Sequence, residues 1–210
     1  MQGPILHILQ DPRLGLDVEA SLVVSRIEQY LQLLLKWNQK INLTAEKAPE
    51  EILKKHVFDS LQYVRAIEPG FRMMDIGSGA GFPGILLKII FPQLQLVLLE
   101  SQRKRCSFLE TVVRDLAMEQ VKVFNARAED IPGDQAGPFD VVVFRAVSGV
   151  QQCLNLSTKF LPSGGMVVLK KSPGENQLGS HPEFSLQKEV AITSYHGVVS
   201  SLLVFEKCFT

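Results

Sequence analysis

The sequence lacks the features of a disulfide-stabilised, metal-binding or membrane-spanning protein. It has three cysteines in 210 residues, Cys106, Cys153 and Cys208, which are odd in number and far apart. This pattern fits neither a disulfide framework nor a zinc site and indicates a reducing compartment. The four histidines show no metal-ligand spacing, so we expect no metal. No apolar run approaches the ~18–20 residues that span a bilayer, and the N-terminus has no basic leader. We therefore expect a cytoplasmic protein with no membrane partner.

The chain also has no excess of charge of either sign. Lysine plus arginine and aspartate plus glutamate both number 22, which gives a formal net charge of +0. Global charge therefore does not indicate a nucleic-acid binder, and such a partner would have to meet a local basic patch. The composition, 46% hydrophobic and 21% charged, is typical of a globular chain and excludes wholesale disorder.

Hydrophobic spacing divides the chain at about residue 70. Over residues 1–70, apolar residues recur at helical spacing, which predicts an N-terminal helical extension. The first long helix is expected to be capped by Asp17 or Ser21 and to break at 38–44. A further helix is expected to begin at Pro49, because proline suits a first helical position.

Residues 71–210 alternate short apolar runs with helix-length segments. Strands are predicted at 72–76, 95–100, 121–125, 139–144 and 166–170, and an antiparallel pair at 186–195 and 202–207. Strands that alternate with helices form βαβ units, which predicts an α/β fold with a doubly wound, mostly parallel seven-stranded sheet. The polar segment 172–184 is typical of a lid or of a merely mobile loop.

The sharpest motif is a glycine-rich loop, MMDIGSGAGFPG, at residues 73–84. An apolar strand leads into Gly77, Gly79 and Gly81, and an apolar helix follows. Glycine permits positive φ and close approach of a ligand to the backbone, and the helix offers unpaired N–H groups. Residues 79–84 satisfy GxGxxG, so a nicotinamide cofactor has to be considered.

Two carboxylates indicate a different cofactor. Asp75 precedes the first glycine, where it would confront a pyrophosphate at short range but would suit an ammonium group. Glu100 ends the next strand, where a carboxylate can accept hydrogen bonds from ribose hydroxyls. Together they predict a site for an adenosine joined to an amino acid, S-adenosylmethionine. A nicotinamide-dependent oxidoreductase is the disfavoured alternative.

The ends of the later strands extend this crevice, because open parallel sheets bind ligands outside the carboxyl ends of their strands. This rule nominates Arg127, Ala128, Glu129, Arg145, Lys170 and Lys171. No histidine or cysteine adjoins the glycine loop in the sequence, so a general base is not expected. His56 is instead expected to pair with Asp59, in a structural role.

The best candidate for a basic patch is the run Arg103, Lys104 and Arg105. Ser101 is expected to cap the helix that follows. The three cations would then lie in the first helical turn, against the preference of the helix dipole. Such an unfavourable placement indicates an external anion, and a solvated helix face is the alternative.

Several segments together carry a family resemblance: WNQKINLTA (37–45), KHVFDSL (55–61), DIGSGAGFPGI (75–85), LLESQRKRCSFL (98–109), NARAED (125–130) and FRAV (144–147). They resemble the glucose-inhibited division protein B family of bacterial 16S ribosomal RNA guanine-N7 methyltransferases. The resemblance covers roughly residues 25–172 in order. The combination of the WN…NLT and GFPG motifs is more specific than the glycine loop alone.

The resemblance implies a Rossmann-like class I methyltransferase domain at 71–210, behind the helical extension at 1–70. It implies S-adenosylmethionine as donor, with Gly77, Phe82, Ala128, Glu129 and Arg145 at the matching binding positions. The implied partner is 16S rRNA or the 30S subunit. On this interpretation the basic run 103–105 and Arg127 contact RNA, and the chain is expected to be a monomer.

The implied chemistry requires no general base. Guanine N7 has a lone pair and no proton, so it can attack the sulfonium methyl directly. Catalysis is then expected from positioning, with Arg145 and Lys170 as the positioning residues. Two further functions stay open: an S-adenosylmethionine-dependent methyltransferase acting on a small molecule or protein, and a non-catalytic binding module.

Overall fold

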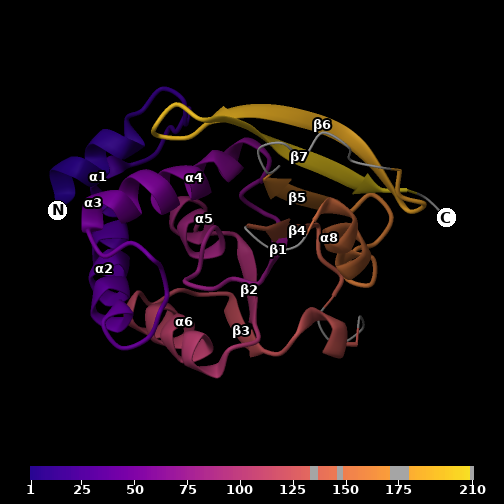
Figure 1. Ribbon diagram of the computed structural model, residues 1–210, viewed down its shortest axis with the longest axis horizontal. Helices are drawn as coiled ribbons and strands as arrows, with labels where there is room; N and C mark the ends of the chain where they lie inside the picture. Colours follow the sequence, from indigo (N-terminus) through magenta and orange to yellow (C-terminus); the bar gives the residue numbers. More distant parts are fainter. Residues whose placement is uncertain (133–136, 146–148, 171–179, 209–210) are drawn as a thin grey trace.

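A seven-stranded sheet forms the centre of the computed structural model, which describes residues 1–132, 137–145, 149–170 and 180–208 (Figure 1). The strands are β1 Arg72–Ile76, β2 Gln95–Glu100, β3 Val121–Asn125, β4 Val141–Phe144, β5 Met166–Lys170, β6 Phe184–Thr193 and β7 Val199–Lys207. Their order is β3-β2-β1-β4-β5-β7-β6. The first five are parallel, whereas β7 is antiparallel to both β5 and β6. The predicted α/β, mostly parallel sheet with an antiparallel pair at one edge is confirmed.

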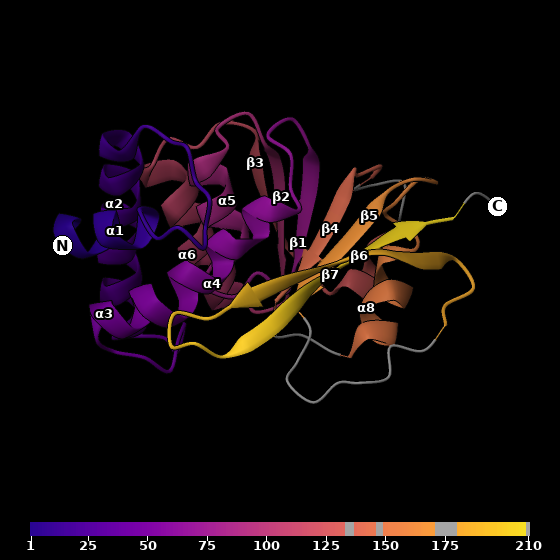
Figure 2. The same cartoon turned by 90° about the horizontal axis from the view of Figure 1, so that it is seen from above.

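Helices cover both faces of the sheet. They are α1 Gln2–Leu9, α2 Ala20–Asn38, α3 Pro49–Ile52, α4 Phe58–Leu61, α5 Gly84–Ile90, α6 Arg103–Asp115 and α8 Val150–Ser157. A π-helical stretch, η1 Leu53–Val57, joins α3 to α4, and short 3-10 helices lie at η2 Gln62–Arg65 and η3 Ala128–Asp130. Seen from above, α1 to α6 lie to one side of the sheet and α8 lies apart from them, next to β4 and β5 (Figure 2).

The N-terminal helices pack on the sheet domain through α5 and α6. The apolar stripe of α2, which includes Ile27, Tyr30 and Leu34, is completely buried. These residues share one apolar cluster with α5, α6 and one face of the sheet, while α8 covers a second cluster on the other face. Residues 1–70 therefore form a wall beside the sheet, and their status as a separate unit stays a prediction.

Some predicted boundaries were wrong. Helix α2 begins after Glu19 without a side-chain cap, so neither Asp17 nor Ser21 caps it. Strand β4 begins two residues later than predicted, because the N–H of Phe139 bonds the carbonyl of Phe160 rather than a neighbouring strand. Strands β6 and β7 begin earlier than predicted. The residues added at their starts include exposed ones and show little hydrophobic pattern, so the sequence did not indicate that they belong to the strands.

Three features from the sequence fall wholly or partly outside the described residues. They are Lys171, the part 172–179 of the polar segment, and the end of the FRAV motif. No helix of the described chain is long and apolar enough to cross a membrane.

Candidate functional site

Four charged residues at the carboxyl ends of the parallel strands point to the same face of the sheet. Side chains alternate along a strand, so residues two apart share a face. In β1, Met73 lies in the cluster under the N-terminal helices, α5 and α6, and Asp75 follows two residues later. The same parity holds for Glu100 at the end of β2, Arg145 just after β4 and Lys170 at the end of β5. Two acids and two cations therefore lie on one face of the sheet at its carboxyl edge.

Both acids hold the glycine loop from beneath. Oδ2 of Asp75 accepts the N–H of Gly84 at 3.0 Å, and Oε2 of Glu100 accepts the N–H of Gly79 at 2.9 Å. The other oxygen of Glu100 accepts the N–H of Gln102 at 2.8 Å. The two carboxylates thus tie the loop to β1 and β2, a role that the sequence did not predict.

Asp75, which the sequence predicts to bind the cofactor, is completely buried beneath the glycine loop. The reason is that α5 begins directly above it and covers the end of β1. Burial raises the pKa of Asp75 to about 8. Its second oxygen, Oδ1, is buried and has no hydrogen-bond partner among the described residues.

A pocket of about 240 Å³ lies across the strand ends from this cluster and borders the glycine loop. It is lined by Ile76, Gly77, Leu99, Ser101, Ala126, Arg127, Ala128, Glu129, Gln152 and Leu156. Gly77 has a φ of 76°, a left-handed conformation that strains other residues, so the loop meets the pocket with bare backbone. The structure thus brings together Gly77, Ala128 and Glu129, which the sequence predicted for one site. Arg127, predicted to contact RNA, lines the same pocket.

The ring of Phe82 in the glycine loop contacts two further side chains, His56 and Arg145. The His56 ring lies parallel to that of Phe82, with centroids 5.2 Å apart and 15° between the planes. The guanidinium of Arg145 lies over the same phenyl ring at 5.1 Å and donates a hydrogen bond to Nδ1 of His56 at 2.6 Å. A histidine therefore does lie beside the glycine loop, although none adjoins it in the sequence.

The partners of His56 determine its tautomer. Arginine cannot accept a hydrogen bond, so Nδ1 must accept from Arg145 and the ring proton must lie on Nε2. Nε2 then donates to Glu46, whose Oε2 is 2.5 Å away. Burial and the charge of Arg145 lower the pKa of His56, which favours this neutral form. Hydrogen bonds from Lys55 and His56 lower the pKa of Glu46 to about 2.

An ion pair between Lys170 and Asp59 also lies at the carboxyl edge of the sheet. The ammonium group of Lys170 lies 2.5 Å from Oδ2 of Asp59, which comes from α4 in the N-terminal extension. The predicted pairing of His56 with Asp59 was therefore wrong. The helix carries the two side chains to different strand ends, where His56 meets Arg145 and Asp59 meets Lys170.

Two buried tyrosines of the N-terminal extension brace the site. The hydroxyl of Tyr30 in α2 donates to the carbonyl of Ala80 in the glycine loop at 2.6 Å. The hydroxyl of Tyr63 in η2 donates to the carbonyl of Phe144, next to Arg145, also at 2.6 Å. The sequence predicted these tyrosines only as helix residues. Their contacts span 50 and 81 positions, which no local pattern indicates.

The basic run 103–105 occupies the first turn of α6, as predicted. Gln102, not Ser101, precedes the helix, and no side chain caps it. The hydroxyl of Ser101 instead lies 3.5 Å from Oε1 of Glu100. Arg103 and Lys104 are exposed, whereas Arg105 reaches back to within 3.9 Å of Glu100. Among the residues that the structure describes, no three His, Cys, Asp or Glu side chains form a group that could hold a metal ion.

Sequence comparison identifies a family match over most of the chain. The family model GidB, described as rRNA small subunit methyltransferase G, matches residues 23–202. A curated relative from Streptococcus pyogenes serotype M4 (strain MGAS10750), named ribosomal RNA small subunit methyltransferase G, is 42% identical over 164 residues. That match covers 75% of this chain and 69% of the relative. Other relatives of this name match over 66% of their length, so the chain spans about two thirds of these proteins.

Solved structures share the fold at low sequence identity. Cofactor-bound Rv0187 from MTB aligns with a TM-score of 0.60 and 16% identity, over 89% of this chain and 91% of that one. A mutant of MtNAS in complex with S-adenosylmethionine aligns with a TM-score of 0.58 and 15% identity, over 100% of this chain and 84% of that one. These likenesses agree with the predicted Rossmann-like fold.

Proposed function

The chain belongs to the rRNA small subunit methyltransferase G family, and we propose that it transfers the methyl group of S-adenosylmethionine to N7 of a guanine in 16S ribosomal RNA. Membership of the family confirms the predicted enzyme class, an S-adenosylmethionine-dependent methyltransferase of ribosomal RNA. The observation that carries the finer proposal is the arrangement at the carboxyl edge. There the pocket lined by Gly77, Ala128 and Glu129 borders the glycine loop, and both ring nitrogens of His56, which lies beside the loop, are already engaged.

The residues at this edge fit the donor. We propose that the pocket at Gly77, Ala128 and Glu129 holds its adenosine part. A carboxylate offers about four acceptor positions, and backbone N–H groups occupy two on Glu100, which leaves capacity for ribose hydroxyls. The orphaned Oδ1 of Asp75 fits an ammonium donor. When bound, S-adenosylmethionine supplies a methyl group on a positively charged sulfur.

The protein's part in the chemistry is positioning. Guanine N7 has no proton to lose, and both nitrogens of His56 are already engaged by Glu46 and Arg145. His56 therefore holds its neighbours in place rather than moving a proton. A general base is unnecessary because there is no proton to remove, and alignment of the reactants contributes up to ~7–11 kcal/mol in favourable cases.

Arg145 is proposed to bind an anionic group, either the methionine carboxylate or an RNA phosphate. Positive charge passes from sulfur to the purine during transfer, so a guanidinium in contact with the reacting atoms would oppose the reaction. The Phe82 ring beneath it and the hydrogen bond to His56 fix its position. Lys170 is proposed as a second positioning residue, with its charge balanced by Asp59.

The target guanine is proposed to be unpaired. The deep, narrow major groove of an A-form helix hides N7, so the base must come from a loop or be turned out of a stack. We propose that a monomer acts on the 30S subunit or its RNA in the cytoplasm. The basic run 103–105 is proposed to meet the RNA backbone.

Mass-spectrometric mapping of ribosomes tests this function. Small subunits from cells with and without the protein are digested, and every methylated nucleotide is located. One N7-methylguanine in 16S rRNA should be present only with the protein, and the purified enzyme should restore it in deficient subunits. Identical methylation in both strains, or transfer to a protein or small molecule instead, would overturn the proposal.

A further inference from the structure

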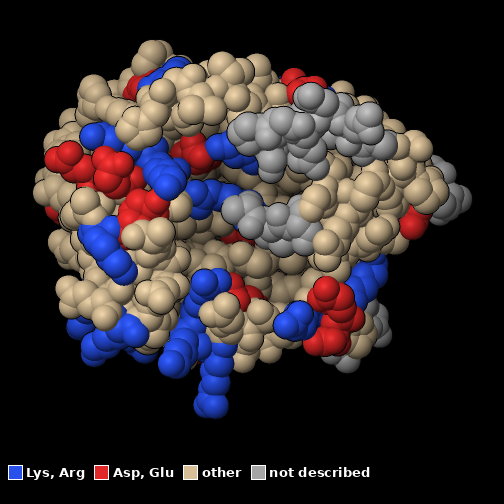
Figure 3. Space-filling model, in the orientation of Figure 1, with Lys and Arg blue, Asp and Glu red and all other residues tan. Residues whose placement is uncertain are grey.

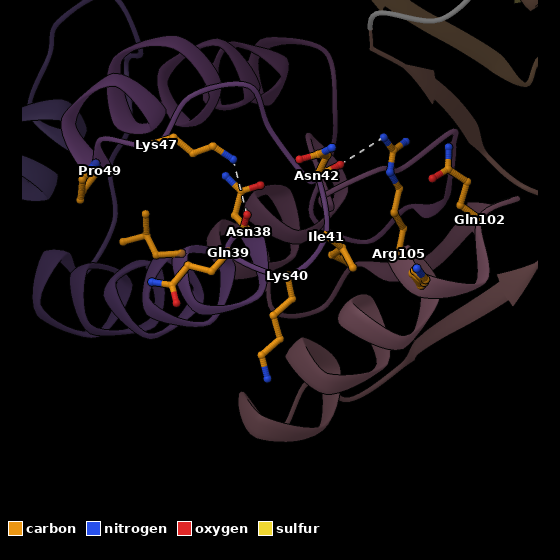
Figure 4. A pocket seen from close by; sticks show the side chains of 11 residues that line it. Asn38, Gln39, Lys40, Ile41, Asn42, Lys47, Pro49, Gln102 and Arg105 are labelled. Carbon is orange, nitrogen blue, oxygen red and sulfur yellow. Dashed lines mark hydrogen bonds between the residues drawn. The ribbon is translucent and has the colours of Figure 1, made fainter.

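A large cavity between described residues lies beside the proposed cofactor site but shares none of its lining residues. It has a volume of about 870 Å³ and separates the end of α2 and the following loop from the start of α6 (Figure 4). It is lined by Leu35, Asn38, Gln39, Lys40, Ile41, Asn42, Lys47, Pro49, Gln102, Lys104 and Arg105. Ligand pockets commonly measure about 300–1,000 Å³, so the space is large enough for a ligand of nucleotide size or more.

The charge of its walls is of one sign. Four lining residues are cations, Lys40, Lys47, Lys104 and Arg105, and none is acidic, although the whole chain has a formal net charge of +0. Within the described part of the chain, Lys40 and Lys104 form no ion pair, and Nε of Arg105 is buried without a partner. Figure 3 shows Lys and Arg side chains gathered at the lower left, over α6 and the lower part of α2, with a group of acidic side chains above them. Such a wall suits a polyanion.

The wall from the N-terminal extension is held in a defined shape. The side chain of Asn38 accepts the N–H groups of Leu43 and Thr44 at 2.9 and 3.1 Å. It also donates to the hydroxyl of Thr44 and to the carbonyl of Glu46. These four bonds fix the loop that carries Lys40 and Lys47. They also explain why asparagine and threonine stand at these positions of the WN…NLT motif.

The cavity is connected to the proposed cofactor site through Arg105. Figure 4 shows its guanidinium pointing to Asn42, with a hydrogen bond of 3.5 Å to that carbonyl. Its other nitrogen lies 3.9 Å from Glu100, which holds the N–H of Gly79 in the glycine loop. A phosphate bound by Arg105 in the cavity would therefore be connected to the glycine loop through the side chains of Arg105 and Glu100.

We propose that this cavity binds the sugar–phosphate backbone of the RNA strand next to the target guanine. Lys40 and Lys47 of the extension form one wall of the binding cleft, and Lys104 and Arg105 form the other. The inference rests on the proposed function for the identity of the RNA, and it adds a role for the extension in holding the substrate. Amide side chains between the cations supply further donors to phosphate oxygens.

The test compares two double variants that remove the same charge. Lys40→Ala/Lys47→Ala alters the cavity, and Lys122→Ala/Lys188→Ala removes two exposed lysines from the edge strands β3 and β6. The affinity for 16S rRNA is measured by filter binding over a range of KCl concentrations. Removal of one lysine–phosphate interaction lowers the slope of log K against log salt by about 0.7 for single-stranded RNA. The cavity variant should therefore lose about 1.4 from this slope and bind about tenfold more weakly at low salt.

Controls separate this inference from the proposed function. The affinity for S-adenosylhomocysteine and the thermal midpoint should equal those of the wild type in both variants, and the edge-strand variant should keep its salt slope. An unchanged slope in the cavity variant, or an equal loss in the edge-strand variant, would overturn the inference. So would binding of a mononucleotide that depends on Lys40 and Lys47 while RNA binding does not. If the wild type binds RNA in this way but methylates no ribosomal RNA, the proposed function fails, whereas the proposed RNA-binding role of the cavity is upheld.

Discussion

Arg145 donates a hydrogen bond of 2.6 Å to Nδ1 of His56, a residue 89 positions earlier in the chain. The bond joins the end of β4 to the N-terminal helical extension, and both side chains rest on Phe82. It requires a neutral imidazole, because a protonated ring has no acceptor. The state of one histidine therefore decides how the proposed anion-binding arginine is held.

Methyl transfer should fall at acidic pH as His56 takes up a proton. The folded protein lowers the pKa of His56 from 6.5, so the neutral form persists at neutral pH and is lost only at a pH below that ordinary value. Arg145 and Lys55 oppose the proton and Glu46 favours it. We expect kcat/KM to be flat at neutral pH and to decline below it. His56→Asn keeps an acceptor for Arg145 and does not titrate, so the decline of kcat/KM at acidic pH should vanish in this variant. His56→Ala should lose activity at every pH. An acid limb that persists in His56→Asn would contradict this role.

Arg145→Ala should lower turnover at least tenfold, which corresponds to ~1.4 kcal/mol of transition-state free energy. The reason is the loss of the proposed contact to an anionic group of the cofactor or RNA. Turnover is measured with 30S subunits, and circular dichroism checks that the variant is folded. Arg114→Ala is the matched control, because that side chain is 72% exposed on α6 and its one ion pair with a described residue is with Asp115. Wild-type turnover in Arg145→Ala would remove the residue from the site.

Asp75→Asn should stabilise the protein more at pH 8 than at pH 5. Folding raises the pKa of Asp75 from 3.8 to about 8, so between these values the native state holds a proton that the unfolded state has released. The stabilising contribution is fully present below about pH 4 and is lost as the pH rises through 8. Asparagine resembles the protonated acid and does not titrate. Urea unfolding at pH 5, 6.5 and 8 measures the difference, and a gap that stays constant with pH would show that Asp75 is ionised in the native state throughout.

Gly84→Ala should destabilise the protein by about 1–3 kcal/mol. A Cβ at this position would lie 2.7 Å from Oδ2 of Asp75 and 2.8 Å from Leu98, both buried. The loop would have to move, so the affinity for S-adenosylhomocysteine should also fall. Gly70→Ala is the control, since no atom lies within 4 Å of its added carbon. Equal thermal midpoints for the two variants would show that the loop is not held against Asp75.

The regular part of the fold could be predicted from the sequence because its pattern is local. Alternation and apolar runs placed β1, β2, β3 and β5 at their observed bounds. The fit of a carboxylate to the ammonium and ribose groups of the cofactor nominated Asp75 and Glu100. The rule that ligands bind at the carboxyl ends of parallel strands nominated Arg145 and Lys170 among others, and the structure places these four side chains on one face. Strand parity could have indicated this shared face as well. The caps at Ser21 and Ser101 failed, because neither side chain bonds the start of its helix.

The partners of these four residues could not be predicted from the sequence. His56 and Asp59 lie one helical turn apart, which suggested a pair, yet each side chain meets a residue from a distant strand. Asp75 was predicted only as a carboxylate suited to an ammonium group, and the position of α5 shows that it is buried beneath the loop. Glu46 entered no prediction, because its contacts with Lys55 and His56 lie nine and ten positions away and no local pattern indicates them.

The secondary structure, the glycine loop and the kinds of charged group that end each strand follow from the sequence alone, since they depend on residues close together in the chain. The packed fold determines which of those groups are buried, which are paired and which face open space. Burial and pairing depend on contacts between the N-terminal helices and distant strands, such as the contact between Asp59 and Lys170, which lie 111 positions apart. Those contacts follow from packing of apolar helix faces on the sheet, and packing is a property of the whole chain.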